Sequence, residues 1–371
     1  MKTLNNFDFE GKTVLLRCDL NSDVKNKKLL KSERIKESSI TIKELKKKKA
    51  RVIILAHQGR PGDSDFISLE QHCKQLNKYT HVTFVKDLLG LRAEKAIRNL
   101  KNGEAILLEN IRFLKEEFNP GENSITRFFS NLCEIYVNDA FSVCHRKQTS
   151  ILLPKYIKKS CAGRILEREV NALKKIKLKK TLYVLGGAKP EDNIKLIGKH
   201  RILSCGLFGQ VCLINKGKKL GEQEIYLRKK KAFVRIPKNK LKRVETPIDF
   251  AVDINGRKEI SLKGFPNSHE IFDIGSETQK RYVREIRNAN AIYMKGPAGD
   301  CAKKGFSEGT FSILRAIANS KAFSVIGGGH LSDAIEASRI NKNKFGHISL
   351  SGGALLNYIA GEKLPGLKAL K

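Results

Sequence analysis

The chain has 371 residues, of which 40% are hydrophobic and 30% are charged, and its formal net charge is +34. This length exceeds what one hydrophobic core usually serves, so we expect two domains. No stretch approaches the ~20 apolar residues of a membrane span, and the segment Met1 to Glu10 lacks the apolar core of a secretory signal. We therefore expect a cytoplasmic protein.

The cysteines and the basic residues exclude two further classes. None of the eight cysteines forms a CxxC pair or has a metal-ligand spacing to a histidine, which favours buried thiols over a disulfide framework or a zinc site. Lysines are spread along the chain, in runs such as Lys46 to Lys49 and Arg228 to Lys231, without interleaved aromatic residues. This pattern argues against specific nucleic-acid recognition, although it predicts non-specific polyanion binding at low salt.

Short apolar runs rich in β-branched residues predict strands along the whole chain. In the first half they are Thr13–Cys18, Arg51–Ala56, Val82–Val85, Ala105–Glu109 and Glu134–Asn138. In the second half they are Thr181–Leu185, Ile202–Cys205, Ile248–Val252, Ala291–Met294 and Ala322–Ile326. Because these runs do not alternate, they indicate strands buried on both faces, as in a parallel sheet. Helical patterns between them predict doubly wound α/β architecture.

Local signals place some helix ends and a domain boundary. Ser68 with Gln71, and Ser276 with Gln279, have the spacing of a capping box. From Arg164 onward, Leu166, Val170, Leu173 and Ile176 recur at helical spacing, which predicts one amphipathic helix joining the two halves. The stretch Lys216–Thr246 fits no pattern. We therefore expect two Rossmann-like domains (residues 1–162 and 179–353), an interdomain helix (163–178), a cleft between the domains, and a tail (354–371) that returns to the first.

The predicted strands of the first half end in basic and polar residues. Ligands of open parallel sheets bind beyond the carboxyl ends of the strands, so these residues should share one rim. They are Asp19, Asn21, His57, Gln58, Gly59, Arg60, Arg112, His145 and Arg146, with Arg34 slightly farther along the first loop. Clustered guanidinium groups bind carboxylates and phosphates bidentately, so the first half predicts a small substrate with several negative charges.

The second half ends its strands in glycine. The segments are Gly186-Gly187 before Lys189, Gly296-Pro297, Gly327-Gly328-Gly329 before His330 and Leu331, and Gly352-Gly353 after Ser351. Glycines between a strand and a helix let phosphates approach backbone N–H groups at the positive end of the helix. An anion clamp in one half and a phosphate cradle in the other predict phosphoryl transfer, which depends on positioning and charge neutralisation.

Several of these motifs, in this order, resemble those of phosphoglycerate kinases. They are RCDLN from Arg17, HQGRP from His57, ENIRF from Glu109, NDAF from Asn138 with His145 and Arg146, GGAK from Gly186, GP at Gly296 and GGG from Gly327. They cover nearly the whole chain, and HRKQ from His145, GPAG from Gly296 and the short segment around Gly206 are closest to the archaeal branch. The resemblance implies reversible, magnesium-dependent transfer from 1,3-bisphosphoglycerate to ADP, a step of glycolysis and gluconeogenesis, with domain closure about a hinge.

The resemblance also assigns roles by position. Asp19, Asn21, Arg34, His57, Gln58, Gly59, Arg60, Arg112 and Arg146 match the phosphoglycerate site. Gly187, Lys189, Gly206, Gly296, Pro297, Gly327, Gly328, Gly329, His330 and Leu331 match the nucleotide site. Lys189 matches the lysine that neutralises the transferring phosphoryl group, Arg34 the arginine that assists it, and Gly328 the helix start that receives its oxygens. The expected partners are these substrates alone, and we expect a monomer.

Some positions depart from the family pattern, all on the nucleotide side. His330 stands where many members carry an aspartate near the metal, so no metal ligand is assigned, although Asp333 is close in sequence. Ala302 replaces a glutamate, and Ser351 interrupts the last glycine run. Asn193 replaces a second lysine after Lys189, and Lys295 replaces an asparagine before Gly296. An alternative function is therefore a phosphoglycerate-binding protein with an impaired nucleotide site.

Overall fold

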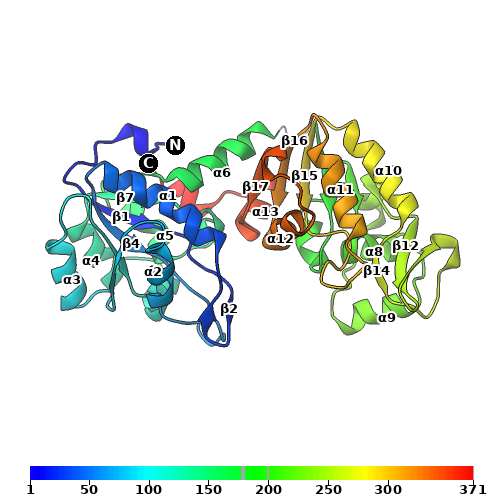
Figure 1. Ribbon diagram of the computed structural model, residues 1–371, viewed down its shortest axis with the longest axis horizontal. Helices are drawn as coiled ribbons and strands as arrows, with labels where there is room; N and C mark the ends of the chain where they lie inside the picture. Colours follow the sequence, from blue (N-terminus) through cyan, green and yellow to red (C-terminus); the bar gives the residue numbers. More distant parts are fainter. Residues whose placement is uncertain (177–179, 199, 371) are drawn as a thin grey trace. The chain divides into compact units, whose positions relative to one another are not determined.

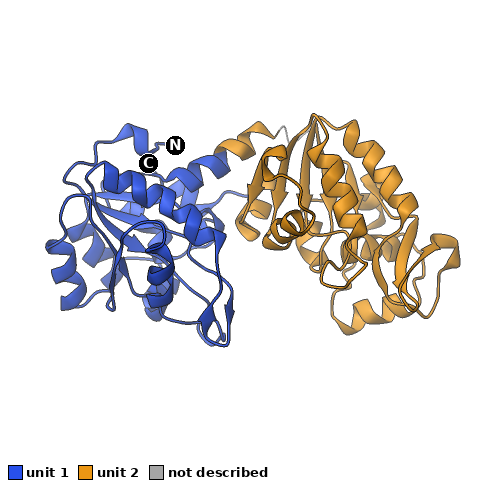
Figure 2. Cartoon of the chain, in the orientation of Figure 1, with its two compact units in different colours: residues 1–170, 361–371 blue, residues 171–360 orange. Residues whose placement is uncertain are grey.

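The computed structural model describes residues 1–176, 180–198 and 200–370, and the chain folds into two compact units. Unit 1 comprises Met1–Val170 and Gly361–Lys371, and unit 2 comprises Asn171–Ala360 (Figure 2). Each unit is built on a six-stranded parallel sheet (Figure 1). The predicted architecture of two parallel-sheet α/β domains is thus confirmed.

The sheet of unit 1 has the order β5-β6-β4-β1-β7-β8. Its strands are β1 (Thr13–Arg17), β4 (Arg51–Leu55), β5 (Thr83–Val85), β6 (Ala105–Leu108), β7 (Ile135–Asn138) and β8 (Lys159–Ala162). From β1 the chain fills one side of the sheet with β4, β5 and β6, and it then crosses to β7 on the other side. The order therefore reverses between β1 and β7, which is where ligands bind in such sheets.

Helices cover both faces of this sheet. They are α1 (Glu33–Lys47), α2 (Glu70–Leu76), α3 (Leu91–Arg98), α4 (Ser124–Leu132), α5 (Thr149–Leu152) and, after the return from unit 2, α14 (Pro365–Ala369). Alternate strand residues face opposite sides. Val14 and Leu16 therefore pack in one apolar cluster with α1 and α2, and Leu15 packs in another with α3 and α4. Burial on both faces explains why the strands read as unbroken apolar runs.

Short elements complete unit 1. They are the hairpin β2 (Val24–Lys25) and β3 (Lys28–Leu29), and the 3-10 helices η1 (Leu4–Asn6), η2 (Ile111–Phe113), η3 (Lys115–Phe118), η4 (Phe141–Val143) and η5 (Leu153–Lys155). The C-terminal segment packs here, since the N–H of Gly366 donates to the Cys144 carbonyl at 2.9 Å. Residues 354–360 belong to unit 2.

The helix predicted from Arg164 is α6 (Arg164–Lys175), which begins in unit 1 and ends in unit 2. Leu166, Val170, Leu173 and Ile176 are all buried, as their spacing predicts. Residues 177 and 178 of the expected interdomain segment lie outside the described residues.

The main sheet of unit 2 has the order β11-β10-β9-β15-β16-β17. Its strands are β9 (Thr181–Leu185), β10 (Ile202–Ser204), β11 (Val244–Glu245), β15 (Ala291–Lys295), β16 (Phe323–Gly327) and β17 (His347–Ser349). The strand order reverses between β9 and β15. Both of these strands end in the segments that carry the glycines and lysines singled out above.

The helices of unit 2 follow these strands. They are α7 (Pro190–Ile194), α8 (Gly206–Asn215), α9 (Glu222–Lys229), α10 (Ser276–Arg287), α11 (Glu308–Ala318), α12 (Gly329–Ala337) and α13 (Gly353–Ile359), with 3-10 helices η7 (Lys238–Arg243), η8 (Leu262–Gly264) and η9 (Lys342–Lys344). Helices α9 and η7 lie in the stretch that fitted no sequence pattern, and β11 closes it. No helix among the described residues is both long and apolar enough to cross a membrane.

One strand prediction is wrong in its partners. The run Ile248–Val252 was expected in the parallel sheet, yet it forms β12 (Asp249–Asp253) between β13 (Arg257–Ser261) and β14 (Ile271–Ile274) in a three-stranded antiparallel sheet. The apolar face of β12 packs against Leu213 of α8 and Leu220. Because that packing buries Phe250 and Val252, the sequence of β12 has the same apolar pattern as a strand of a parallel sheet.

Neither predicted capping box forms. Helix α2 begins at Glu70, and the Glu109 carboxylate accepts from the Leu69 N–H at 2.9 Å and from the Ser68 hydroxyl at 2.7 Å. Helix α10 begins at Ser276, and the Asp249 carboxylate accepts from the N–H groups of its first turn. Carboxylates distant in sequence thus do the capping that local spacing suggested.

Candidate active site

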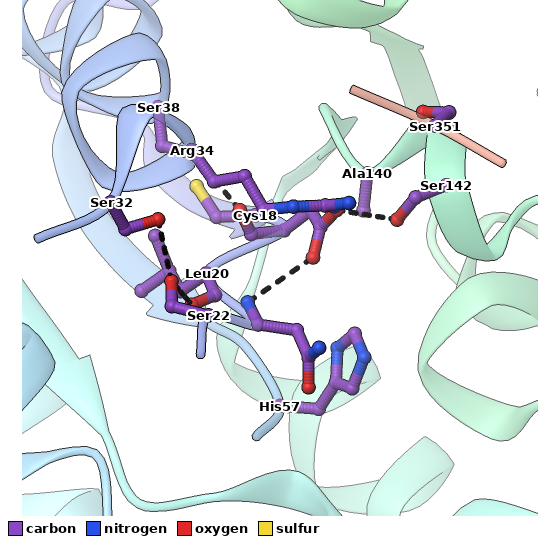
Figure 3. A network of polar contacts seen from close by, with 12 residues as sticks. Cys18, Leu20, Ser22, Ser32, Arg34, Ser38, His57, Ala140, Ser142 and Ser351 are labelled. Carbon is purple, nitrogen blue, oxygen red and sulfur yellow. Dashed lines mark hydrogen bonds and ion pairs between the residues drawn. The ribbon is translucent and has the colours of Figure 1, made fainter. Parts of the chain in front are cut away.

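The loop after β1 in unit 1 is organised around the carboxylate of Asp19. Arg34 of α1 forms an ion pair with it, and the Ser142 hydroxyl donates to it at 2.5 Å (Figure 3). The same carboxylate accepts from the N–H of Asn21 at 3.2 Å. The Asp19 carboxylate therefore holds Arg34 and the loops after β1 and β7 in place, at the carboxyl ends of the two strands between which the strand order reverses.

The loop after β4 is tied to its neighbours through Asn21 and Asn110. The N–H of Gly59 donates to the Asn21 side-chain oxygen at 2.8 Å, and the Asn110 amide donates to the Gln58 carbonyl at 2.8 Å. The Gln58 side chain is fully buried and bonds to both backbone groups of Ser22, at 2.9 and 3.0 Å. Gln58 thus braces two loops, and its amide is occupied by the backbone of Ser22.

Arg17 and His57 form a buried pair beneath these loops. Arg17 is the last residue of β1, and its Nη2 lies 3.2 Å from Nδ1 of His57. Because a guanidinium can only donate, Nδ1 must accept and the ring proton of a neutral His57 lies on Nε2. Burial and the positive charges of Arg17, Arg112, Arg146 and Arg34 hold the pKa of His57 well below its usual value. His57 therefore offers a neutral N–H donor rather than a charge.

Arg112, which follows β6, is the most constrained cation of the rim. Its Nη1 donates to the Gly59 carbonyl, while Nε and Nη2 are buried without a hydrogen-bond partner among the described residues. Burial and the charges of Arg17, Arg146 and Arg60 lower its pKa to about 10. Unpaired buried donors are costly, so this guanidinium is arranged for an acceptor that the described residues do not supply.

Arg146 and Arg60 complete the cationic group. Burial lowers the pKa of Arg146, and the nearby charge of Arg60 adds to the shift. Arg60 itself is exposed. The structure therefore brings together most of the residues that the sequence placed on this rim: Asp19, Asn21, Arg34, His57, Gly59, Arg60, Arg112 and Arg146. Their mutual repulsion makes a multiply charged anion the natural ligand.

Sequence reasoning missed the support beneath this rim. Arg17 is fully buried, and its Nε donates to the Ser150 hydroxyl at 2.9 Å. That hydroxyl donates in turn to the buried Glu117 carboxylate at 2.6 Å. The available signal was an arginine closing the apolar run of β1, because a charge seldom ends a strand buried on both faces unless it is paired.

Asp139, part of the quoted NDAF motif, caps α6 instead of joining the rim. Its carboxylate accepts from the N–H groups of Ile165 and Leu166 at 2.8 and 3.1 Å. Gly163 is needed beside it, because a Cβ there would lie 2.4 Å from the same oxygen. Burial raises the pKa of Asp139 to about 6, above its ordinary value of 3.8.

The raised pKa predicts a pH-dependent stability. A carboxyl that holds its proton more tightly when folded stabilises the protein most below pH ~4, and this contribution is lost as the pH rises through about 6. Asp139→Asn should retain the acceptor but not the titration. We therefore expect the free energy of unfolding of the wild type to fall, relative to the variant, by roughly 2–3 kcal/mol between pH 4 and 7. Urea unfolding measures this, with the exposed Asp63→Asn as control, and parallel curves for Asp139→Asn and wild type would contradict it.

In unit 2, most loop glycines are required by close contacts between loops. A Cβ on Gly186 would lie 2.3 Å from the Pro297 carbonyl oxygen, and one on Gly296 would lie 2.6 Å from the Gly186 oxygen. Gly206, with φ +52°, starts α8 against the backbone of Gly187. These glycines let the loops after β9 and β15 pack against each other, so the space where a side chain would stand is filled by the neighbouring loop.

The start of α12 is different. A Cβ added to Gly328 or Gly329 would meet none of the described residues within 4 Å, and Gly328 has φ +107°. No side chain in the described part of the chain caps this helix. Gly328 and Gly329 therefore leave room for a ligand at the positive end of α12, whereas Gly327 packs against Leu355.

The side chains around α12 divide between solvent and core. His330 is exposed, and so is Asp333 one turn farther along. Leu331 is fully buried in the core, so only its backbone is available to a ligand. Among the described residues, no group of three or more histidine, cysteine, aspartate or glutamate side chains could hold a metal ion. A divalent cation here would need ligands from a bound molecule.

Two lysines lie at the ends of β9 and β15. Lys189 follows Gly186 and Gly187, is exposed, and forms no ion pair within the described part of the chain. Lys295 is mostly buried and contacts Asp192 and Asn193 of α7. The charge of Lys189 contributes to lowering the pKa of Lys295, although burial is the larger cause. The carboxyl ends of β9 and β15 therefore carry two neighbouring cations.

Comparison with known proteins agrees with this arrangement. The family model for phosphoglycerate kinase matches residues 4–362. The phosphoglycerate kinase of Methanothermus fervidus is 40% identical, with 100% of this chain and 96% of that protein aligned, and that of Pyrococcus abyssi is 38% identical, with 100% and 97% aligned. The crystal structure of phosphoglycerate kinase from Pyrococcus horikoshii OT3 superposes with a TM-score of 0.90 at 35% identity, covering 100% of this chain and 98% of that one.

The two parallel-sheet units and the cation-rich strand ends define an α/β phosphotransferase. The family match spans nearly the whole chain. The chain belongs to the phosphoglycerate kinase family, and the resemblance found in its motifs is confirmed.

Proposed function

We propose that this chain catalyses reversible phosphoryl transfer from 1,3-bisphosphoglycerate to ADP, giving 3-phosphoglycerate and ATP. The observation that carries the proposal is the group of arginines in unit 1, with two buried guanidinium nitrogens of Arg112 that lack an acceptor among the described residues. A three-carbon acid bearing phosphate supplies several acceptor oxygens and negative charge at once. Arginine forks suit both kinds of group.

We assign the rim of unit 1 to the phosphoglycerate. Arg60, Arg112 and Arg146 are the cations for its phosphate and carboxylate, and His57 donates through Nε2. Asp19 and Asn21 position Arg34 and the loop at Gly59 through the hydrogen bonds described above. Gln58 acts indirectly, through the backbone of Ser22.

We assign the strand ends of unit 2 to the nucleotide. Gly328 and Gly329 are the proposed binding point for phosphoryl oxygens, because they are open at the start of α12. Gly187, Gly206, Gly296 and Pro297 lie at the same strand ends, and Gly327, His330 and Leu331 flank α12. In this proposal, Asn193 and Lys295 also belong to the nucleotide side.

The proposed chemistry asks little covalent work of the protein. A terminal phosphate oxygen of ADP attacks the acyl phosphate, the bond from phosphorus to the carboxyl oxygen breaks, and 3-phosphoglycerate leaves as a carboxylate. Negative charge is spread over the oxygens of the moving group during this step. Lys189 and Arg34 are the cations proposed to meet that charge, and the held substrates provide the alignment.

Magnesium fits this proposal as part of the nucleotide substrate. The described residues form no cage for a metal ion, and His330 replaces the expected carboxylate. Mg²⁺ commonly keeps several waters and binds through substrate phosphates with one or two carboxylates. We therefore propose that it arrives with ADP or ATP, with Asp333 as a nearby carboxylate.

The test is direct. Formation of ATP from 1,3-bisphosphoglycerate and ADP, measured with purified protein and magnesium, should show steady turnover. A folded protein that binds 3-phosphoglycerate but neither forms ATP nor binds ADP would instead support the alternative of a degenerate binding protein, which no observation here favours. Including GDP in the assay tests nucleotide choice, which the replacement at Ala302 leaves to experiment.

The remaining expectations stay predictions. A monomer in the cytoplasm, with these substrates as its only specific partners, is consistent with the family. The net charge of +34 predicts non-specific polyanion binding that weakens steeply with salt, without preference for a nucleic-acid sequence.

A further inference from the structure

Lys295 lies on the proposed nucleotide side of unit 2, but no role has yet been given to its ammonium group. It is the last residue of β15, paired in register with Leu185 at the end of β9. The strand order reverses between these two strands, so Lys295 ends beside the crevice where ligands of such sheets bind. Lys189 lies in the loop that follows the neighbouring strand, β9.

The ammonium of Lys295 is held by α7. Its Nζ lies 3.2 Å from Oδ1 of Asn193 and 3.3 Å from Oδ2 of Asp192, and its side chain is 14% exposed. Asn193 is fully buried, and its Nδ2 donates to the Gly186 carbonyl at 3.0 Å. Because that bond orients the amide, its oxygen faces Lys295, and the ammonium is held at the glycine-rich loop.

These contacts leave the ammonium able to bind a ligand. An ammonium has three N–H donors, and Asn193 and Asp192 account for two. Asp192 is 42% exposed and makes one long contact, so it neutralises the charge only in part. Burial, together with the charge of Lys189, lowers the pKa of Lys295, and an anion between the two lysines would relieve both effects.

We propose that Lys295 is a second phosphate-binding cation of the nucleotide site, which contacts the terminal phosphates of ADP and ATP beside Lys189. The inference rests on the proposed function. It also joins two departures from the family pattern, because Asn193 stands at a lysine position and Lys295 at an asparagine position. The exchange keeps one ammonium and one amide in hydrogen-bond contact, with the cation moved from α7 to the end of β15.

The first experiment removes the ammonium alone. Lys295→Met retains the aliphatic stem that is buried here, so the fold should persist, and thermal unfolding checks this. We expect ADP affinity, measured by calorimetry, to fall about 10- to 100-fold, the loss typical of a hydrogen bond to a charged group, and kcat to fall as well. Lys321→Met is the control, because Lys321 is exposed and precedes β16. It therefore lies at the amino ends of the strands, whereas Lys295 lies at the carboxyl end of β15. Wild-type ADP affinity in a folded Lys295→Met protein would overturn the inference.

The second experiment tests the exchange. Lys295→Asn should lose ADP affinity and kcat like Lys295→Met, and adding Asn193→Lys should restore both to within about threefold of wild type, since the ammonium returns across the same hydrogen bond. A double variant no better than Lys295→Asn would refute the exchange. ADP binding does not require turnover. If the wild type formed no ATP but Lys295→Met still bound ADP more weakly than the wild type, the proposed reaction would be refuted and this inference would stand.

Discussion

Lys189→Ala should lower kcat about 10³-fold while changing the KM of either substrate by less than about threefold, by analogy with cations that meet the charge of a transferring phosphoryl group. The ammonium has no ion-pair partner in the described part of the chain, so it is available for charge that develops during the reaction. Ground-state binding relies on other groups: the arginines of unit 1, the open start of α12 and the proposed contact of Lys295. An interaction made mainly in the transition state appears in kcat.

Steady-state kinetics of the coupled reaction measure this split. Lys321→Ala removes another exposed lysine, at the amino ends of the strands rather than their carboxyl ends, and should behave as wild type. Lys189→Arg should recover only part of the rate, because a planar guanidinium does not reproduce a compact ammonium. A Lys189→Ala protein with unchanged kcat and a raised KM would show that the residue only binds the nucleotide.

The sequence predicted five strands of the parallel sheet of unit 1 to within one residue at each end but missed β8 (Lys159–Ala162). The physical reason for the five correct predictions is their burial. A strand covered by helices on both faces must be apolar throughout, so β1 and β4 stand out from the polar segments around them. The same rule misassigned β12, which an antiparallel sheet buries equally well. Strand β13, with the sequence RKEIS, lies largely exposed and gives no apolar signal at all.

The candidate site was predictable where chemistry follows a strand directly. Arg112 and Arg146 were expected at the rim because they follow strands of one parallel sheet. The role of Arg17 was not, because its partners Ser150 and Glu117 come from distant segments that only the fold brings together.

The glycines show a second limit of sequence reasoning. Gly186 and Gly328 look equivalent as letters after a strand. Only the folded chain reveals that a neighbouring loop fills the space beside Gly186, whereas the space beside Gly328 is open. Likewise, the exchange of Asn193 and Lys295 reads as two unrelated losses until their side chains are seen in contact.

Arg112→Met should separate binding from stability. We expect the KM for the phosphoglycerate substrate to rise at least about 30-fold, since truncating one partner of a buried charged contact costs about 2–5 kcal/mol. We also expect the ligand-free protein to become more stable, by up to about 2 kcal/mol. Burial and the neighbouring arginines already lower the pKa of Arg112 to about 10, and removing the strained charge outweighs the lost hydrogen bond to Gly59.

Opposite signs in the two measurements are what distinguish a binding residue from a structural one. Chemical unfolding without ligand gives the stability, and steady-state kinetics with calorimetry of 3-phosphoglycerate give the binding. Arg98→Met is the control, because Arg98 pairs with Glu94 on the exposed face of α3, and exposed pairs contribute little to stability. If Arg112→Met lost stability and kept its KM, the guanidinium would serve only the loop at Gly59. A more stable variant that binds poorly would instead show that the fold holds these arginines together at a cost that the substrate's charge offsets.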